Sequence, residues 1–252
     1  MNLSKYTLRL IPTILTLSAL VATNFSPSVR AQNRANSFEP PAGKDMPRGG
    51  TAGGGSRPVA SACSPSKNAV KSETLTALSP GRHLGLTQSA RPRLLVYVPQ
   101  TTAQTMEFSL FDEQMNGVYQ MNLPVSNRTG LISIELPENA PSLVKDKPYY
   151  WTVALVCNPE ERTEDMVVGG WIERTELNDS LKQELAKVRG LERVSFYAKQ
   201  GLWYDAVNTL LELQQTEPGN AAIAASWAEL LKSVGLDAIA LTSYQLSVTS
   251  LQ

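Results

Sequence analysis

The chain has 252 residues, with 23 basic and 23 acidic side chains, one histidine, two cysteines and 42% hydrophobic content. This length allows one or two folded domains, and the composition is not that of a wholly disordered chain. The single histidine, His83, excludes histidine-rich metal sites, and two cysteines exclude four-cysteine zinc and iron–sulfur sites. We therefore expect neither a metal nor a cofactor.

Residues 1–31 have the three regions of a secretory signal peptide. Lys5 and Arg9 supply the positive start, and residues 10–22 are uncharged and mostly apolar. Val29 and Ala31 are small or medium residues at the third and first positions before a cleavage site after Ala31. The apolar run of about a dozen residues is shorter than the roughly 20 that a transmembrane helix needs. We expect cleavage, a periplasmic or secreted protein and no stable membrane span afterwards. An uncleaved anchor is the alternative.

The charge of the remaining chain argues against nucleic acid as a partner. Without residues 1–31 the chain has 20 basic and 23 acidic side chains, and residues 71–252 have 15 and 21, a net charge of −6. Nucleic-acid binding depends on neutralising phosphates, and no basic stripe interleaved with aromatic residues is present. We expect no nucleic-acid partner.

Residues 32–70 are predicted to be a Gly/Pro/Ser-rich disordered linker. Of the 27 residues from 40 to 66, 15 are Gly, Pro or Ser, and such a segment cannot offset its own ordering entropy. A phosphate-binding glycine loop at residues 49–55 is the alternative. That motif needs a preceding strand, a following helix and a closing Gly-Lys-Ser/Thr, and none of these is present.

Residues 71–176 predict a β-sandwich region of short strands punctuated by Pro and Gly. The predicted strands are Arg93–Val98, Met106–Leu110, Val118–Met121, Leu131–Leu136, Tyr149–Cys157 and Met166–Thr175. The second and third form a hairpin around the Asn-Gly pair at residues 116–117. Strands without intervening helices favour an antiparallel sandwich. The strand at 149–157 is apolar on both faces, so we expect it to be covered on both sides.

Residues 177–252 change to a helical period and are expected to pack on the sandwich. Three helices are predicted, at about 177–198 with a break or bend near Gly190, at 203–216 and at 220–234. Asn178, Asp179 and Ser180 are candidate N-caps of the first helix, Asn220 is the candidate N-cap of the third, and Gly235 fits its C-terminal cap. The middle of this region resembles a tetratricopeptide unit in Gly201, Tyr204, Ala206, Leu210, Pro218 and Asn220. About one and a half units fit, and a free solenoid needs three.

The expected fold class is therefore α+β. An N-terminal antiparallel β-sandwich is followed by a C-terminal tetratricopeptide-like helical hairpin of about three helices. We expect this hairpin to share the core of the sheet rather than to form a peptide-binding groove.

Cys63 and Cys157 are predicted to form a disulfide, because an even cysteine count in an exported chain favours one. The bond would pin the end of the linker to the end of the strand at 149–157. The alternative is a cysteine nucleophile served by His83, which no local motif supports. His83 itself lies in a turn-rich segment, where a satisfied or solvated histidine is the simpler interpretation.

Two acidic clusters are the remaining candidates for chemistry. Paired carboxylates about 5–10 Å apart across a cleft can hydrolyse glycosides. Asp112, Glu113, Glu161 and Asp165 would have to converge with Trp171 on one concavity to do so. Both clusters adjoin predicted turns, where acidic side chains are usually only solvated. The second cluster also lacks the spacing of an EF-hand calcium loop.

Several segments together resemble a cyanobacterial family, the domain of unknown function 928. They are Leu75–Leu78, Leu84–Thr87, Val96–Pro99, Glu107–Glu113, Tyr149–Trp151, Val156–Pro159, Gly170–Ile172, Gly201–Ala206 and Val234–Leu236, in that order. The resemblance implies an exported cyanobacterial protein and brings no catalytic residues.

Two hypotheses follow from these observations. The first is a non-enzymatic binding or accessory module of the cell envelope with an envelope or extracellular protein as partner, using loops such as 99–105 and 158–165. The alternative is a carbohydrate-active enzyme that uses the paired carboxylates.

Overall fold

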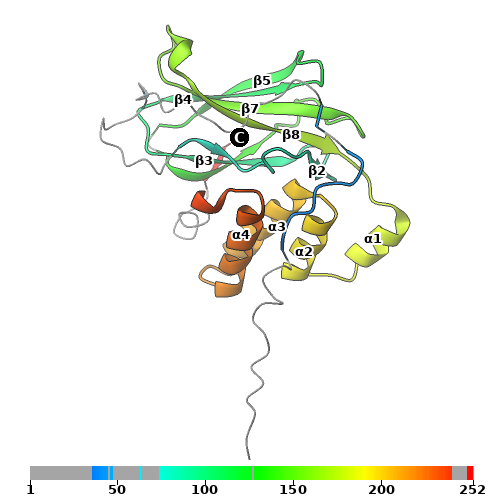
Figure 1. Ribbon diagram of the computed structural model, residues 1–252. Helices are drawn as coiled ribbons and strands as arrows, with labels where there is room; N and C mark the ends of the chain where they lie inside the picture. Colours follow the sequence, from blue (N-terminus) through cyan, green and yellow to red (C-terminus); the bar gives the residue numbers. More distant parts are fainter. Residues whose placement is uncertain are drawn as a thin grey trace, which may run out of the picture.

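The computed structural model describes residues 36–44, 46–47, 63, 74–126, 128–239 and 249–251. The predicted signal peptide and most of the predicted linker lie outside these residues. The described chain is α+β, with two β-sheets one above the other and helices α2, α3 and α4 together on one side of them (Figure 1).

Both sheets contain short strands that the sequence did not predict. One sheet has the order β2 (Gly85–Thr87), β8 (Met166–Arg174), β7 (Pro148–Val156), β4 (Thr105–Phe111) and β5 (Gly117–Pro124). The other has the order β1 (Thr76–Ala77), β3 (Arg93–Val98), β6 (Gly130–Glu135) and β9 (Thr249–Leu251).

All six predicted strands are present, but the expectation of purely antiparallel sheets is wrong. β2 pairs with β8 and β9 pairs with β6, and both pairs are parallel. β1, β2 and β9 are two or three residues long, too short to show an alternation of apolar and polar residues.

The predicted hairpin forms between β4 and β5. In β4 the side chains of Met106, Phe108 and Leu110 are all at most 2% exposed, as the alternation in sequence predicts. The connection is longer than a two-residue turn, because Asp112 N donates to Asn116 O and Met115 takes a φ of 64°. The Asn-Gly pair therefore closes a loop rather than making the whole turn.

The described residues contain four complete α-helices, and residues 237–239 are helical as well, where three helices were predicted. The four complete helices are α1 (Asp179–Leu185), α2 (Gly190–Lys199), α3 (Trp203–Thr216) and α4 (Ala221–Ser233). Gly190, with a φ of +52°, starts α2 as a separate helix. Of the three candidates at the start of α1, Asn178 is the N-cap, and its side chain accepts a backbone N–H group. Asn220 caps α4 in the same way, and Gly235 follows α4 with a φ of +80°, both as predicted. Among the described residues, no helix has both the length and the apolar character needed to cross a membrane.

Helix α3 joins the helical layer to both sheets. It contacts β2 of one sheet, β3 of the other, and helices α2 and α4 on its far side. Tyr204, in its first turn, is fully buried and packs over Gly85, where an added Cβ would lie 2.6 Å from the Tyr204 ring. Trp203 Nε1 donates to the Leu78 carbonyl at 2.8 Å. The likeness of these helices to a tetratricopeptide unit stays a prediction.

Residues 36–44 differ from the linker prediction, because they pack along the helices as an N-terminal strap. Phe38 is 6% exposed and meets the Trp203 ring edge-on at 5.3 Å. The strap's hydrogen bonds join Asn36 to Ser195 and Ser226, the Phe38 amide to Ser233, and the Glu39 amide to the Ala198 carbonyl. One buried aromatic ring thus anchors a segment whose composition is that of a linker.

Candidate functional site

The two predicted carboxylate clusters lie at opposite ends of the five-stranded sheet. Asp112 and Glu113 follow the last residue of β4, and Glu161 and Asp165 lie between β7 and β8, beyond the first residue of β4. The seven residues of β4 span roughly 20 Å. The four carboxylates therefore share no cleft, and the paired arrangement that a glycosidase needs is absent from the described chain.

Each cluster instead stabilises its own turn. Asp112 accepts from the Asn116 side chain and from the backbone of Gln114 and Asn116, and these bonds lower the pKa of Asp112. Asp165 accepts the Cys157 amide at 3.1 Å and pairs with Arg162. No group of three or more possible metal ligands is found among the described residues.

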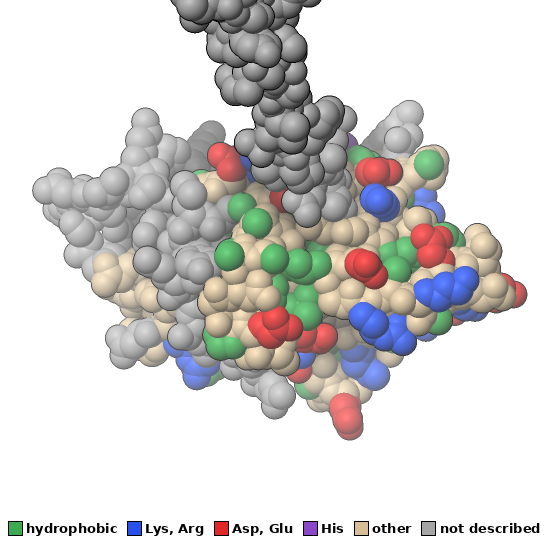
Figure 2. All heavy atoms as spheres, turned by 90° about the horizontal axis from the view of Figure 1, so that it is seen from below, with side chains coloured by type: hydrophobic (Ala, Val, Ile, Leu, Met, Phe, Trp, Pro, Cys, Tyr) green, Lys and Arg blue, Asp and Glu red, His purple; other side chains and the backbone are tan. Residues whose placement is uncertain are grey.

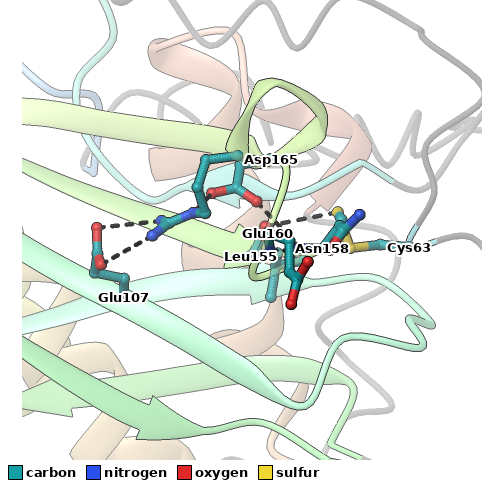
Figure 3. Close-up of polar contacts among 8 residues, drawn as sticks. Cys63, Glu107, Leu155, Asn158, Glu160 and Asp165 are labelled. Atoms are coloured by element: carbon teal, nitrogen blue, oxygen red, sulfur yellow. Dashed lines mark hydrogen bonds and ion pairs between the residues drawn. A yellow bond between two sulfur atoms is a disulfide. The ribbon is translucent and has the colours of Figure 1, made fainter.

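The predicted disulfide is present at the Asp165 end of the sheet. Cys63 and Cys157 are bonded, with a Cα–Cα distance of 4.9 Å. Figure 3 shows Cys63 on one side of Asp165 and Glu107 on the other, with dashed lines marking the hydrogen bonds of this end of the sheet. Arg162 bridges Glu107 and Asp165. Because Cys63 and Cys157 are joined in the disulfide, neither is available as a nucleophile, and His83 has no thiol to activate.

Trp171 is buried in the core, and His83 is exposed on a turn. Trp171 is 3% exposed, and its ring lies 5.1 Å from that of Tyr150 in a small apolar cluster between the sheet and α2. It is part of the core and no ligand platform. His83 is exposed, with its ring 6.3 Å from Phe38.

The described residues form one polar cleft that the sequence did not reveal. It lies where α2 and α3 meet the end of β2, the start of β3 and the end of β6, and its volume is about 370 Å³. We call it the α2–α3 cleft. Its charged lining consists of Arg91, Arg93, Glu135, Arg193, Asp205 and Glu212. A polar concavity bringing together residues from distant parts of the chain is a candidate ligand site.

Asp205 has the most perturbed carboxyl group of the cleft. It occupies the first turn of α3, between the buried residues Tyr204 and Ala206. Burial raises its pKa to about 6, even though the Gln88 amide donates to its Oδ2 at 3.1 Å. Burial, and after it the negative charge of Asp205, raises the pKa of the Tyr197 hydroxyl across the same cleft. Perturbed titratable groups of this kind gather at functional sites.

Two residues that line the cleft each have a buried side-chain atom with no hydrogen-bond partner in the described structure. The atoms are Arg193 Nε on α2 and Asn208 Oδ1 on α3. The other end of the Asn208 amide is held, because its Nδ2 donates to the Arg93 carbonyl at 2.9 Å. A buried donor and a buried acceptor left unpaired are costly.

The charges of the cleft balance one another. Arg93 Nε donates to Glu135 at 2.8 Å, and its guanidinium lies 3.9 Å from Glu212. Arg91 donates to the carbonyls of Glu138 and Ala140. Together the three arginines and three acids leave no net charge. The helical side of the molecule has the same mixed character, with basic side chains beside acidic ones over its described part (Figure 2).

A family model for the Domain of Unknown Function DUF928 matches residues 52–244, more than half of the chain. The chain belongs to the DUF928 family. The matched range contains both cysteines, strands β1 to β8, helices α1 to α4 and every residue of the α2–α3 cleft. It excludes strand β9 and the N-terminal strap. A comparison with curated proteins returns no match.

DUF928 membership confirms the family resemblance, but it assigns no activity to the cleft. Sequence reasoning missed the cleft because its walls come from four separate segments of the chain. One local signal was available in Trp203-Tyr204-Asp205-Ala206, where an acid stands among side chains of a helix face that is otherwise buried. An acid in a first helical turn is common because it caps the helix and interacts favourably with the helix dipole, so this signal does not by itself indicate a site.

Proposed function

We propose that this DUF928 protein is an exported, non-enzymatic binding module of the cell envelope whose ligand site is the α2–α3 cleft. The binding role depends on one observation: polar and charged side chains from two helices and from strand ends of both sheets line one cleft, and among them Asp205 has a raised pKa. The packed helices α2 and α3 and the adjoining ends of β2, β3 and β6 position these side chains, as in preformed ligand sites.

Export is the second part of the proposal. The Cys63–Cys157 bond supports it, because disulfides persist in oxidising compartments and are rare in the cytosol. The signal-like residues 1–31 lie outside the described structure and support it from sequence alone. The separation of the carboxylate clusters along β4 argues against the alternative, a carbohydrate-active enzyme using those residues.

Export is tested by making the full chain in a bacterium and fractionating the cells. We expect the product outside the inner membrane, with its mass fitting cleavage after Ala31 and two oxidised cysteines. A cytosolic product that keeps residues 1–31 and two free thiols would overturn this part.

The binding role is tested without assuming a ligand. The purified protein is mixed with the small-molecule fraction of an envelope extract from cells that make it, and native mass spectrometry records retained mass. We expect Asn208→Ala to lose a ligand that the wild type keeps. Gln214→Ala is the matched control, because Gln214 also lies on α3 and has a buried, unpaired amide oxygen, but lies outside the cleft. Equal retention by wild type and Asn208→Ala, or none by either, contradicts the binding role.

A further inference from the structure

Strand β5 is an open edge of the five-stranded sheet. Among the described strands it pairs only with β4, and Figure 1 shows it at the rim of the sheet, on the side away from helices α2, α3 and α4. The opposite edge, β2, is covered, because the Leu86 amide donates to the Gly201 carbonyl just before α3 and α3 packs on β2. An uncovered edge strand offers its unpaired backbone groups to another strand.

The register of the β4–β5 hairpin shows which backbone groups of β5 point outward. The Val125 amide donates to the Gln104 carbonyl at 3.0 Å, and directly opposed residues bond to each other at every second position of an antiparallel ladder. Counting back from this bond in steps of two, the odd-numbered residues from 119 to 123 bond to β4. The N–H and C=O groups of Gln120 and Asn122 therefore point away from β4, and no described residue outside the strand bonds to them.

The sequence of β5 leaves the middle of this edge unprotected. Natural edge strands carry a charged side chain, a proline or a bulge that discourages pairing. The eight residues of β5 include no charged side chain, and the bulge and the proline lie at its two ends, opposite Gly117 and at Pro124. Pro124 belongs to the outward-pointing set, where the missing N–H costs no bond to β4. The segment between these ends is free to accept another strand.

The charges beside β5 indicate that the other strand comes from a second copy of this chain. When two β5 strands pair antiparallel about a two-fold axis, the start of each strand lies beside the end of the other. The exposed acid Glu113 lies four residues before the start of β5, and the basic Arg128 lies four residues after its end. An antiparallel pair therefore brings opposite charges together at both ends, whereas a parallel pair would bring like charges together.

We propose that β5 is a dimerisation edge, at which two copies of the chain pair antiparallel with Gln120 of one copy opposite Asn122 of the other. These two residues then exchange backbone hydrogen bonds on both sides of the axis, and the two five-stranded sheets become one continuous sheet. In the same register the half-buried Met121 lies on the axis, beside its counterpart. The proposal does not depend on a ligand in the α2–α3 cleft.

The test measures the oligomeric state of the purified, disulfide-bonded protein by analytical ultracentrifugation. The protein concentration runs from about 1 µM to 1 mM, because the contact is small and small contacts are weak. We expect a monomer–dimer equilibrium. Amide hydrogen exchange read by NMR locates the contact. The amides of Gln120 and Asn122 should become protected as the dimer forms, whereas that of Met121, which donates to β4, should be protected at every concentration.

Three substitutions at one position test the backbone pairing. Gln120→Pro removes an outward donor and leaves the bonds to β4 in place, and Gln120→Lys adds a charge of the kind that blocks natural edges. Each should weaken the dimer at least about tenfold. Gln120→Thr keeps the amide and suits a strand, so it is the matched control and should leave the dimer unchanged. Gln120→Lys gives a separate reading if Gln120→Pro fails to fold.

A charge exchange tests the antiparallel orientation. Glu113→Lys should weaken the dimer about threefold, and Glu113→Lys/Arg128→Glu should restore it, because the exchanged charges attract again. A double variant weaker than the single one would overturn the antiparallel arrangement. A chain that stays monomeric at about 1 mM, a dimer unchanged in both Gln120→Pro and Gln120→Lys, or new amide protection confined to another element would overturn the proposal as a whole.

Discussion

Trp151 Nε1, in the middle of β7, donates a hydrogen bond of 2.8 Å to the hydroxyl of Tyr204 in the first turn of α3. Both side chains are fully buried. The same hydroxyl lies 3.1 Å from the Trp171 carbonyl, to which it donates. A strand near the centre of a sheet is thereby connected to the helix that carries Asp205 and Asn208, so the cleft is held against the core by a specific bond.

Tyr204→Phe should destabilise the fold, because it leaves the buried Trp151 N–H without an acceptor. The expected loss of unfolding free energy is about 1–3 kcal/mol, measured as a lower urea midpoint at an unchanged slope. Tyr119→Phe is the control, since Tyr119 lies on the edge strand β5 and is only half-buried. An unchanged midpoint in Tyr204→Phe would show that the bond contributes nothing.

The Cys63–Cys157 bond should stabilise the chain, because it closes a segment of 94 residues. In the chain-entropy account a loop of this length contributes up to about 4.5 kcal/mol, and losses of about 2–5 kcal/mol are usual when such a bond is removed. We expect the double variant Cys63→Ser/Cys157→Ser to unfold at lower urea.

Reductant supplies the control for this prediction. It should shift the wild type to the midpoint of the double variant and leave the double variant where it is. A wild type that unfolds at the same urea concentration with and without reductant would contradict a stabilising role.

Asp205 should make stability fall as pH rises from about 4 to 6. Its ordinary pKa is 3.8 and its pKa in the folded protein is about 6, so within this window the folded state holds a proton that the unfolded state has lost. Stability therefore decreases with rising pH until both states are ionised, and is constant above that. The decrease is about 1–3 kcal/mol.

Asp205→Asn should flatten this part of the stability profile and raise stability at pH 7, because an amide has no charge to bury and its oxygen can still accept the Gln88 amide. Unfolding is followed by circular dichroism in urea at pH 4, 5, 6 and 7. The control Asp179→Asn changes an exposed acid in the first turn of α1. Parallel profiles for wild type and Asp205→Asn would refute the prediction.

Phe38→Ala should release the N-terminal strap while the rest of the fold remains. The ring is buried against Trp203, and removing a buried aromatic side chain costs about 3–5 kcal/mol in a core, which exceeds what a few backbone hydrogen bonds supply. Hydrogen exchange read by mass spectrometry should show faster exchange at residues 36–44 and unchanged exchange in β7.

Glu39→Ala is the matched control, because the Glu39 side chain is exposed and only its backbone amide contacts the helices. Protection of the strap that survives Phe38→Ala would mean that its hydrogen bonds hold it without the ring.

The sequence predicted those elements whose pattern is local and long enough to repeat. Met106, Phe108 and Leu110 alternate over five residues, and their strand forms as expected. The α3 boundaries, Trp203–Thr216, agree with the predicted helix because its apolar residues recur at helical spacing. The disulfide followed from cysteine count and compartment. Elements as short as β1 or β9 have no period to read, and their pairing depends on strands far away in the chain.

The strap and the cleft were missed for different physical reasons. Residues 36–44 have the composition of a linker, but burial of the Phe38 ring against Trp203 is enough to order the segment. Arg193 and Asn208 have ordinary places on two amphipathic helices, and only the packing of α2 and α3 against the sheet leaves their polar atoms unpaired. The opposite happened with the carboxylate clusters. Asp112 and Asp165 stand out in the sequence as candidate catalytic residues, but they accept hydrogen bonds within their own turns.

The walls of the cleft come from both layers, with Arg93 and Glu135 on strands and Arg193 and Asp205 on helices. A ligand that touches both layers stabilises their docked state by mass action. Separating the helical layer from the sheets would therefore divide the walls of the cleft between the two parts.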